Sequence, residues 1–189
     1  MPLQQLQKKA GVTMANDASN LGTVDWDLLN DVQYGNDLRT VTGNIAAAGG
    51  LSKFLRVTGF GFSIPTGARI DGFLVEIEGH ASVTPLQWQA QIVSAGTWTG
   101  STKTASANAS TDAAHALGGS TDVWGTSWGV DDVNGSSFGV GIAGQNNNGS
   151  LASVARLDLV EMTVFYTPAA ELLRDPSSRF HPRRRLRRN

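Results

Sequence analysis

Alternating residues between Thr58 and Glu78 constrain the fold more than any other feature of this chain. Two runs of β-forming residues flank Pro65-Thr66-Gly67, which reads as a turn because proline fixes φ and glycine tolerates a positive φ. Alternation with a period of two is typical of strands that bury one face. The stretch therefore predicts a hairpin or a corner between core strands, whose buried side chains would be Phe60, Phe62, Ile64, Phe73, Val75 and Ile77.

The same alternation predicts further strands downstream. It is cleanest in residues 86–92, and it returns in residues 138–142 and 155–166. Parity changes at Gly59, at Asp71-Gly72 and near Leu159, and a β-bulge is the usual means of such a change. The remaining expected core residues are Trp26, Trp88, Ile92, Phe138, Val140, Val164 and Tyr166.

The segments between these strands are rich in turn residues. Residues 27–40 predict a loop with a helical turn, and residues 130–134 predict a single helical turn. Residues 145–150 read Gln-Asn-Asn-Asn-Gly-Ser, as expected at a hairpin tip. Short strands separated by turn signals, with 22 glycines and 16% charged residues, favour an all-β fold.

We therefore expect one antiparallel, jelly-roll-like β-sandwich, which fits a chain of 189 residues. The sandwich would span residues 21–168. Residues 1–20 are polar and weakly patterned, and we expect an N-terminal arm that is ordered only against a partner. Residues 169–189 would form a basic C-terminal arm.

Charge is divided unevenly along the chain. Residues 174–189 hold seven arginines and one aspartate, a net charge of about +6, whereas residues 1–173 hold eight basic and fifteen acidic residues, about −7. Such an asymmetry usually marks an interaction arm. No apolar stretch reaches the length of a membrane span, and the N-terminus lacks the apolar segment of a signal peptide, so we expect no membrane partner.

Four pieces of sequence, taken in order, carry a family resemblance. They are Val24-Asp25-Trp26; Thr58 to Glu78; Thr121 to Val140, which includes Asp122-Val123-Trp124-Gly125; and Arg156 to Pro168. Together they resemble a β-sandwich domain of virion structural proteins of tailed bacteriophages, over roughly residues 21–168. The resemblance implies a β-sandwich, a structural role in a virus particle assembled in the host cytoplasm, and no enzymatic residues.

Among stations in such a particle, a capsid decoration protein is our leading hypothesis. Its terminal arms would bind neighbouring virion proteins, and we expect a homo-oligomer in the particle. A neck, tail or fibre component is the alternative station. A different class of function is a carbohydrate-binding module for host attachment; a hydrolase is a weaker third, because no nucleophile–base pair is evident.

The basic tail holds the expected partner-binding residues. Clustered arginines could pair with carboxylates of a neighbouring subunit, contact nucleic acid, or only keep the chain soluble. Apolar residues interrupt the charge, which favours docking on protein, with nucleic acid as the less favoured partner. The residues concerned are Phe180, Arg183, Arg184, Arg185, Leu186, Arg187 and Arg188.

Trp124 and Trp128 lie in a glycine-rich loop and define a possible ligand or interface site. Alternatively, their rings plug an open end of the sandwich.

Other chemistry has weak support in the sequence. Asp131, Asp132 and Asn134 could bind Ca²⁺, but capping of a helical turn is the more common role of such residues. Glu76 and Glu78 could form a carboxylate pair, although solvated strand faces are commoner. His80, His115 and His181 are far apart, and there is no cysteine. We therefore expect no catalytic residue, no cofactor and no metal.

Overall fold

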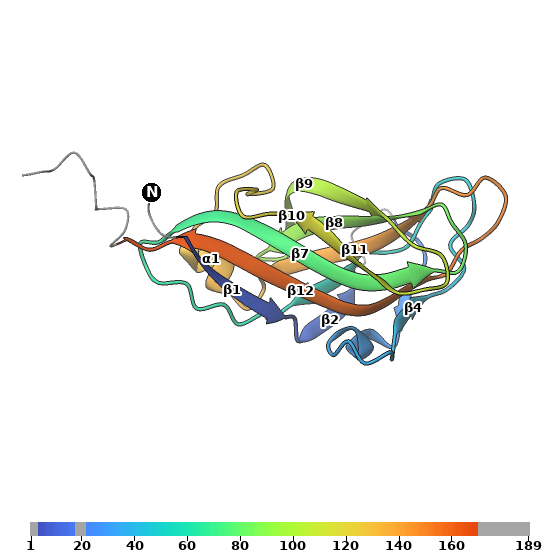
Figure 1. Ribbon diagram of the computed structural model, residues 1–189, viewed down its shortest axis with the longest axis horizontal. Coiled ribbons are helices and arrows are strands. Elements are labelled where there is room, and N and C mark those ends of the chain that lie inside the picture. Colours follow the sequence, from blue (N-terminus) through green and yellow to red (C-terminus); the bar gives the residue numbers. More distant parts are fainter. Residues whose placement is uncertain (1–3, 18–21, 170–189) are drawn as a thin grey trace, which may run out of the picture.

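The computed structural model describes residues 4–17 and 22–169, and it shows two β-sheets packed face to face (Figure 1). Each sheet has six strands, and the pairings between the named strands are antiparallel. Two short helices interrupt the strands, the 3-10 helix η1 (Leu29–Val32) and the α-helix α1 (Val130–Asn134). Both lie where the sequence predicts a helical turn, and the predicted all-β sandwich is confirmed.

Sheet A is built around β7 and β12, the two longest strands. Its order is β10-β7-β12-β4-β3, and β1 pairs with the second half of β12. The bounds of its strands are β1 (Gln5–Ala10), β3 (Trp26–Asp27), β4 (Thr40–Thr42), β7 (Arg69–Ala81), β10 (Ala113–Gly118) and β12 (Ala155–Thr167).

Sheet B has the order β2-β6-β11-β8-β9, and β5 also pairs with β11. β8 and β9 form its one hairpin of consecutive, directly paired strands within the described residues. The bounds of its strands are β2 (Thr13–Asn16), β5 (Gly50–Leu51), β6 (Leu55–Thr58), β8 (Leu86–Ser94), β9 (Thr97–Ser106) and β11 (Gly139–Asn146).

The strand order is that of a jelly roll. β4 pairs with β12 in sheet A and β6 pairs with β11 in sheet B, so early strands of the sandwich lie against late ones. From β6 to β12 the chain changes sheet at every step except between β8 and β9. This interleaving of two Greek keys is the jelly-roll-like topology that the sequence analysis predicts.

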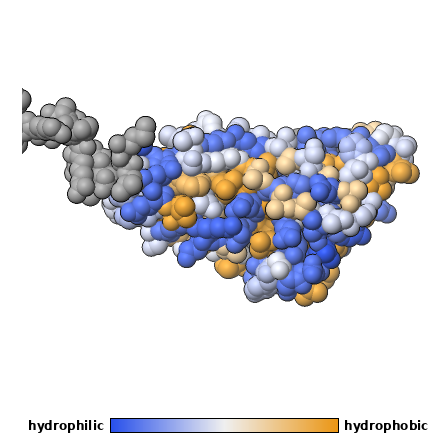
Figure 2. All heavy atoms as spheres, in the orientation of Figure 1, coloured by the Kyte–Doolittle hydropathy of each residue, from blue (hydrophilic) through white to orange (hydrophobic). Residues whose placement is uncertain are grey.

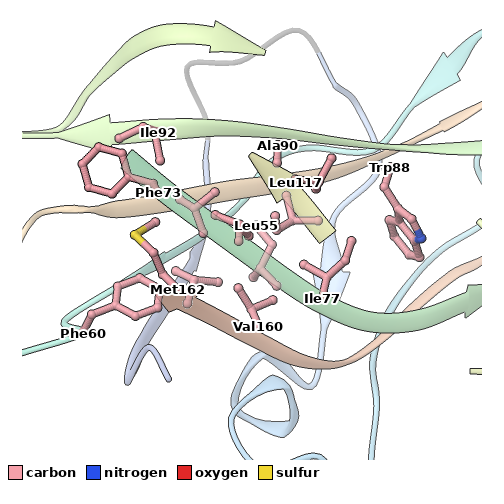
Figure 3. Packing of buried hydrophobic residues seen from close by; sticks show 14 of the residues in the cluster. Leu55, Phe60, Phe73, Ile77, Trp88, Ala90, Ile92, Leu117, Val160 and Met162 are labelled. Carbon is pink, nitrogen blue, oxygen red and sulfur yellow. The ribbon is translucent and has the colours of Figure 1, made fainter. Parts of the chain in front are cut away.

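Inward-facing side chains form one continuous core between the sheets (Figure 3). Phe73 of β7 lies toward one side of this core and Trp88 of β8 toward the other, with Ile77 of β7 between them. Burying an apolar side chain of this size contributes about 1.5–3 kcal/mol. The thirteen residues expected in the core are all at most 6% exposed: Trp26, Phe60, Phe62, Ile64, Phe73, Val75, Ile77, Trp88, Ile92, Phe138, Val140, Val164 and Tyr166.

Two predicted bulges are confirmed in the ladder between β7 and β12. Gly72 pairs with Phe165 and Ile70 with Tyr166, which leaves Asp71 without a partner residue. A second register shift falls between Leu157 and Leu159 and leaves Asp158 unpaired in the same way. Each bulge turns the alternation to the other face, as the change of parity requires.

The segment after Gly59 is not the strand that its alternation predicts. β6 ends at Thr58, and Gly59 has φ +71°, a conformation that favours glycine. The side chains still alternate between buried and exposed, but side-chain amides replace a partner strand: Gln7 bonds both backbone groups of Ser63, and Asn134 bonds both of Ile64. Residues 59–68 form the predicted corner between sheets, and the hairpin alternative is wrong.

Residues 5–16 belong to the sandwich, which corrects the expectation that residues 1–20 form an arm ordered only against a partner. β1 pairs with β12 in sheet A and β2 pairs with β6 in sheet B, so the segment covers one side of the sandwich. The sequence of this segment is polar because β1 is an edge strand with no fully buried side chain, so it lacks the alternation that predicts a strand. Lys8 of β1 lies 2.8 Å from both Glu76 and Glu161, and hydrogen bonds to these carboxylates raise the pKa of Lys8.

Residues 145–150 are not the predicted hairpin tip. Gln145 and Asn146 end β11, and residues 147–154 cross from sheet B to β12 in sheet A. The prediction rested on turn composition, which marks a change of direction but does not say which strands are paired. Asn148 shapes the crossing: its side-chain oxygen accepts the backbone N–H groups of Ser150 and Leu151, and its amide donates to the carbonyl of Thr84.

Candidate functional site

Trp124 closes one end of the sandwich. The ring is fully buried, and its Nε1–H donates a 3.2 Å hydrogen bond to the carbonyl of Phe73. A Cβ at Gly118 would lie 2.6 Å from that Nε1, so only glycine fits beside the ring. A buried indole has no free face for stacking. This corrects the expectation that Trp124 offers a ring to a ligand, and it agrees with the alternative of a structural plug.

A surface ion pair stabilises the loop of Trp124 at this end of the sandwich. Lys103 of β9 lies 2.6 Å from Asp122, and its Nζ is 5.8 Å from the centre of the Trp124 ring. Burial raises the pKa of Asp122, but hydrogen bonds from Lys103 and from the backbone N–H of Trp124 outweigh it and lower that pKa. The carboxylate therefore holds the loop of Trp124 to β9.

Trp128 is half-buried and lines an open depression. Its Nε1–H donates to the carbonyl of Val123 at 2.9 Å, and its ring meets Phe73 and Phe138 edge to face, with centroids 5.5 and 5.6 Å apart. The depression has a volume of about 690 Å³. Its walls are mostly apolar and could hold an apolar side chain or one face of a sugar; they include Ala68, Arg69, Ile70, Val123, Thr126 and Trp128.

Trp98 lies away from this loop, on the hairpin of β8 and β9. It pairs with Val93 across the β8–β9 hairpin, and its ring centre is 5.2 Å from that of Phe54. The guanidinium of Arg56 lies 5.4 Å from the ring centre. Trp98 therefore covers the outer face of sheet B and does not join Trp128.

Two residues of the cluster in α1, Asp132 and Asn134, have structural partners. Asp132 accepts the backbone N–H of Gly129 at 3.0 Å, which caps α1, and Asn134 bonds the backbone of Ile64. Asp132 therefore has the capping role that the sequence analysis favours, whereas Asn134 holds the segment after β6. Among residues 4–17 and 22–169, no group of three or more histidine, cysteine, aspartate or glutamate side chains is placed to hold a metal ion.

The two described histidines lie on opposite faces of sheet A. Nδ1 of His80 is 2.6 Å from Asp112, which also accepts a 2.8 Å bond from Nε of Arg39. Burial raises the pKa of Asp112, but the bonds from Arg39 and His80 outweigh it and lower that pKa. His115 instead faces the core beside the ring of Trp88, where burial lowers its pKa. His181 lies outside the described residues.

A junction at Asp71 ties the beginning and end of the described chain together. Its carboxylate accepts hydrogen bonds from Gln4, from Thr167 at 2.6 Å and from Arg69 at 2.7 Å. Burial raises the pKa of Asp71, but these bonds outweigh it and lower that pKa. Sequence analysis marks Asp71 only as a bulge; a carboxylate at an unpaired strand position is the signal that could have identified it.

The expected partner-binding residues cannot be placed. Phe180, Leu186 and the arginines at 183–185 and 187–188 all lie outside the described residues, so the docking of the basic tail stays a prediction. In the part of the chain that the structure describes, no helix is long and apolar enough to cross a membrane.

Comparison with known proteins adds little to these observations. No family model matches the chain, and none of the curated proteins searched is similar to it. A solved structure described as "CBM4 structure and function" is similar, with 12% sequence identity and a TM-score of 0.42. The match covers 82% of this chain and 92% of the other. At this level of similarity the match carries no argument about function.

Proposed function

We propose that this chain is a non-enzymatic structural protein of a bacteriophage particle, a capsid decoration protein that attaches through one end of its sandwich. The sequence resemblance described above is the first support. The second is geometric: Gln4 and Thr167 both bond Asp71, so the described chain begins and ends at the same end of the long sandwich (Figure 1).

This placement of the chain ends is the observation that carries the proposal. Gln5 pairs with Tyr166, and a Cβ at Gly67 would lie 3.3 Å from Ala169, so the basic segment continues from this end. The loops of residues 44–49 and 147–153 bond one another at the opposite end. A sandwich whose terminal segments leave from one end could attach to a capsid surface by that end and expose the loops of the other end.

Labelling of intact particles tests the proposal. An epitope inserted after Gly149, in an exposed loop at the end far from Asp71, should bind its antibody on particles produced from a phage genome that carries this gene. The same epitope placed after Asn189 should be masked until the particles are disrupted. Absence of the chain from purified particles would contradict the structural role.

The position of the chain in the particle needs a separate measurement. Cryo-electron microscopy of the same particles should place the sandwich on the outside of the capsid. Density at the neck, tail or fibres instead would keep the structural role and reject decoration. Deletion of residues 170–189 should leave particles that lack the protein if the basic segment attaches it.

Carbohydrate binding is the second candidate, and only the half-buried Trp128 beside its depression favours it. A glycan array probed with the protein should then give binding that Thr126→Trp abolishes by filling the depression. Ala152→Trp, in an exposed loop elsewhere, is the control. Binding that is unchanged by Thr126→Trp would exclude this depression as a sugar site.

A further inference from the structure

The loop between β3 and β4 exposes three large apolar side chains. Leu28 is 64% exposed, Tyr34 69% and Leu38 58%, and they are three of the six large apolar residues exposed within the described chain. Figure 2 shows apolar atoms among hydrophilic ones along the lower edge of the molecule, where Figure 1 places this loop beside β4. Isolated apolar residues on a surface are ordinary, but three within one loop make this loop a candidate interaction surface.

Hydrogen bonds to side chains of β4 and β12 hold the loop in place. Thr40 donates its hydroxyl to the carbonyl of Leu28 at 2.8 Å. The buried carboxylate of Asp158 accepts the backbone N–H groups of Asn36 and Asp37, at 3.2 and 3.3 Å. The apolar side chains are therefore presented on a preformed support. A preformed surface loses less conformational entropy when it binds a partner.

The same loop is acidic. Residues 25–39 contain four aspartates and one arginine, and that arginine, Arg39, is already bonded to Asp37 and Asp112. Neither Asp27 nor Asp31 has an ion-pair partner among the described residues. We call Asp27, Leu28, Asp31, Tyr34 and Leu38 the loop patch. It would suit a basic segment that carries apolar residues.

We propose that the loop patch binds residues 174–188 of a second copy of this chain. That segment has seven arginines and one aspartate, interrupted by Phe180 and Leu186, so both its charge and its apolar residues complement the loop patch. The contact joins unlike surfaces of two copies, and repetition of it builds a row or a ring. It goes beyond the proposed role in a particle, because purified protein alone would form it.

The direction of β12 favours a second copy over the same one. Gln33 bridges to Leu159 near the start of β12, which places the loop patch toward that end, whereas the basic segment continues from the other end. The described chain therefore ends, at Ala169, on the side away from its own loop patch. Phe180 follows Ala169 by eleven residues, which can extend up to about 36–40 Å. A neighbour aligned in the same direction would have its loop patch within that length of Ala169.

Cysteine cross-linking of full-length protein tests the contact, because the natural chain has no cysteine. One variant carries Asn30→Cys, at an exposed position within the loop, and another carries Ser178→Cys, two residues before Phe180. Both substitutions keep every residue of the loop patch and every apolar residue of the basic segment. Mixed and treated with a short bismaleimide, they should form a covalent heterodimer. The matched control is Ala152→Cys, an exposed position in another loop, mixed with Ser178→Cys.

The expected result is at least about tenfold more heterodimer for the Asn30→Cys pair than for the control pair, the ratio expected for a specific contact. A yield no higher than the control would overturn the proposal. A chain that carries both Asn30→Cys and Ser178→Cys should give oligomers. If it instead links only within itself, the segment binds its own loop, and the proposed contact between copies is wrong.

Sedimentation at increasing protein concentration provides a second test. Tyr34→Ser with Leu38→Ser should weaken self-association by about tenfold or more, because anchors near the centre of a contact dominate its affinity. Leu151→Ser, an equally exposed leucine in another loop, should leave it unchanged. High salt should weaken the association of the natural protein. Equal association of all three proteins would contradict the proposal, whatever the protein's role in a particle.

Discussion

Two loops of this molecule look alike in sequence and behave differently in the structure. Residues 118–129 and residues 27–39 are both long, turn-rich and interrupted by large apolar residues. In the first, Trp124 is buried, with Phe73 and Phe138 beneath the loop. In the second, Leu28 and Tyr34 face solvent. The comparison teaches that the role of an apolar residue in a loop depends on whether an open edge of the core lies beneath it.

The largest expected effect concerns the core beneath the first loop. Phe73→Ala should lower the free energy of unfolding by about 3–5 kcal/mol, because Phe73 is fully buried against Trp128 and Phe138. Urea unfolding followed by tryptophan fluorescence measures it. A loss below about 1 kcal/mol would mean that this end of the sandwich is less tightly packed than the structure shows.

A smaller effect isolates the hydrogen bond of Trp124. Trp124→Phe should cost about 1–3 kcal/mol, since it removes the bond to the Phe73 carbonyl and part of a buried ring. Trp88→Phe is the matched control, because Trp88 is also fully buried and its Nε1 has no hydrogen-bond partner among the described residues. If both variants lose the same stability, the bond of Trp124 contributes nothing.

Lowering the pH should destabilise the folded sandwich through His115. Burial lowers the folded-state pKa of His115, so its neutral form is favoured in the fold. The resulting stability is fully present above the unfolded pKa of about 6.5 and is lost as the pH falls toward the lower folded value. Melting temperatures between pH 7.5 and 5 should therefore decline more steeply for the natural protein than for His115→Gln. Parallel profiles would contradict the burial of this ring.

The smallest effect on stability belongs to the second loop. Tyr34→Ser and Leu38→Ser should each change the free energy of unfolding by no more than about 0.5 kcal/mol, because both side chains are mostly exposed. Thermal melts of dilute protein measure this. A loss comparable to that of Trp124→Phe would show that the two loops are alike after all.

Sequence reasoning identified the parts of the fold that depend on local pattern. Strand parity selected the buried residues, and changes of parity located the bulges at Asp71 and Asp158. It failed where the partner of a segment is distant in the sequence. The alternation after Gly59 reads as a strand, yet amides of Gln7 and Asn134 supply its hydrogen bonds. Sequence reasoning did not predict β1. Its pairing with β12 is made by backbone groups, which leave no pattern in the side chains.

The candidate sites were harder to predict than the fold. The aromatic residues of the first loop attracted attention although Trp124 is internal, because composition does not reveal what a ring will contact. The loop patch was overlooked because its residues occur among turn formers. A signal was present: three large apolar residues spaced among four aspartates, outside any strand pattern.

Hydrogen exchange of the natural protein tests most directly which loop makes contacts between molecules. Amides of residues 28–38 and of residues 119–128 can be followed by mass spectrometry in dilute and in concentrated protein. We predict that protection of residues 28–38 increases with concentration, while residues 119–128 exchange at the same rate in both samples. Protection that increases at residues 119–128 and not at residues 28–38 would contradict the account.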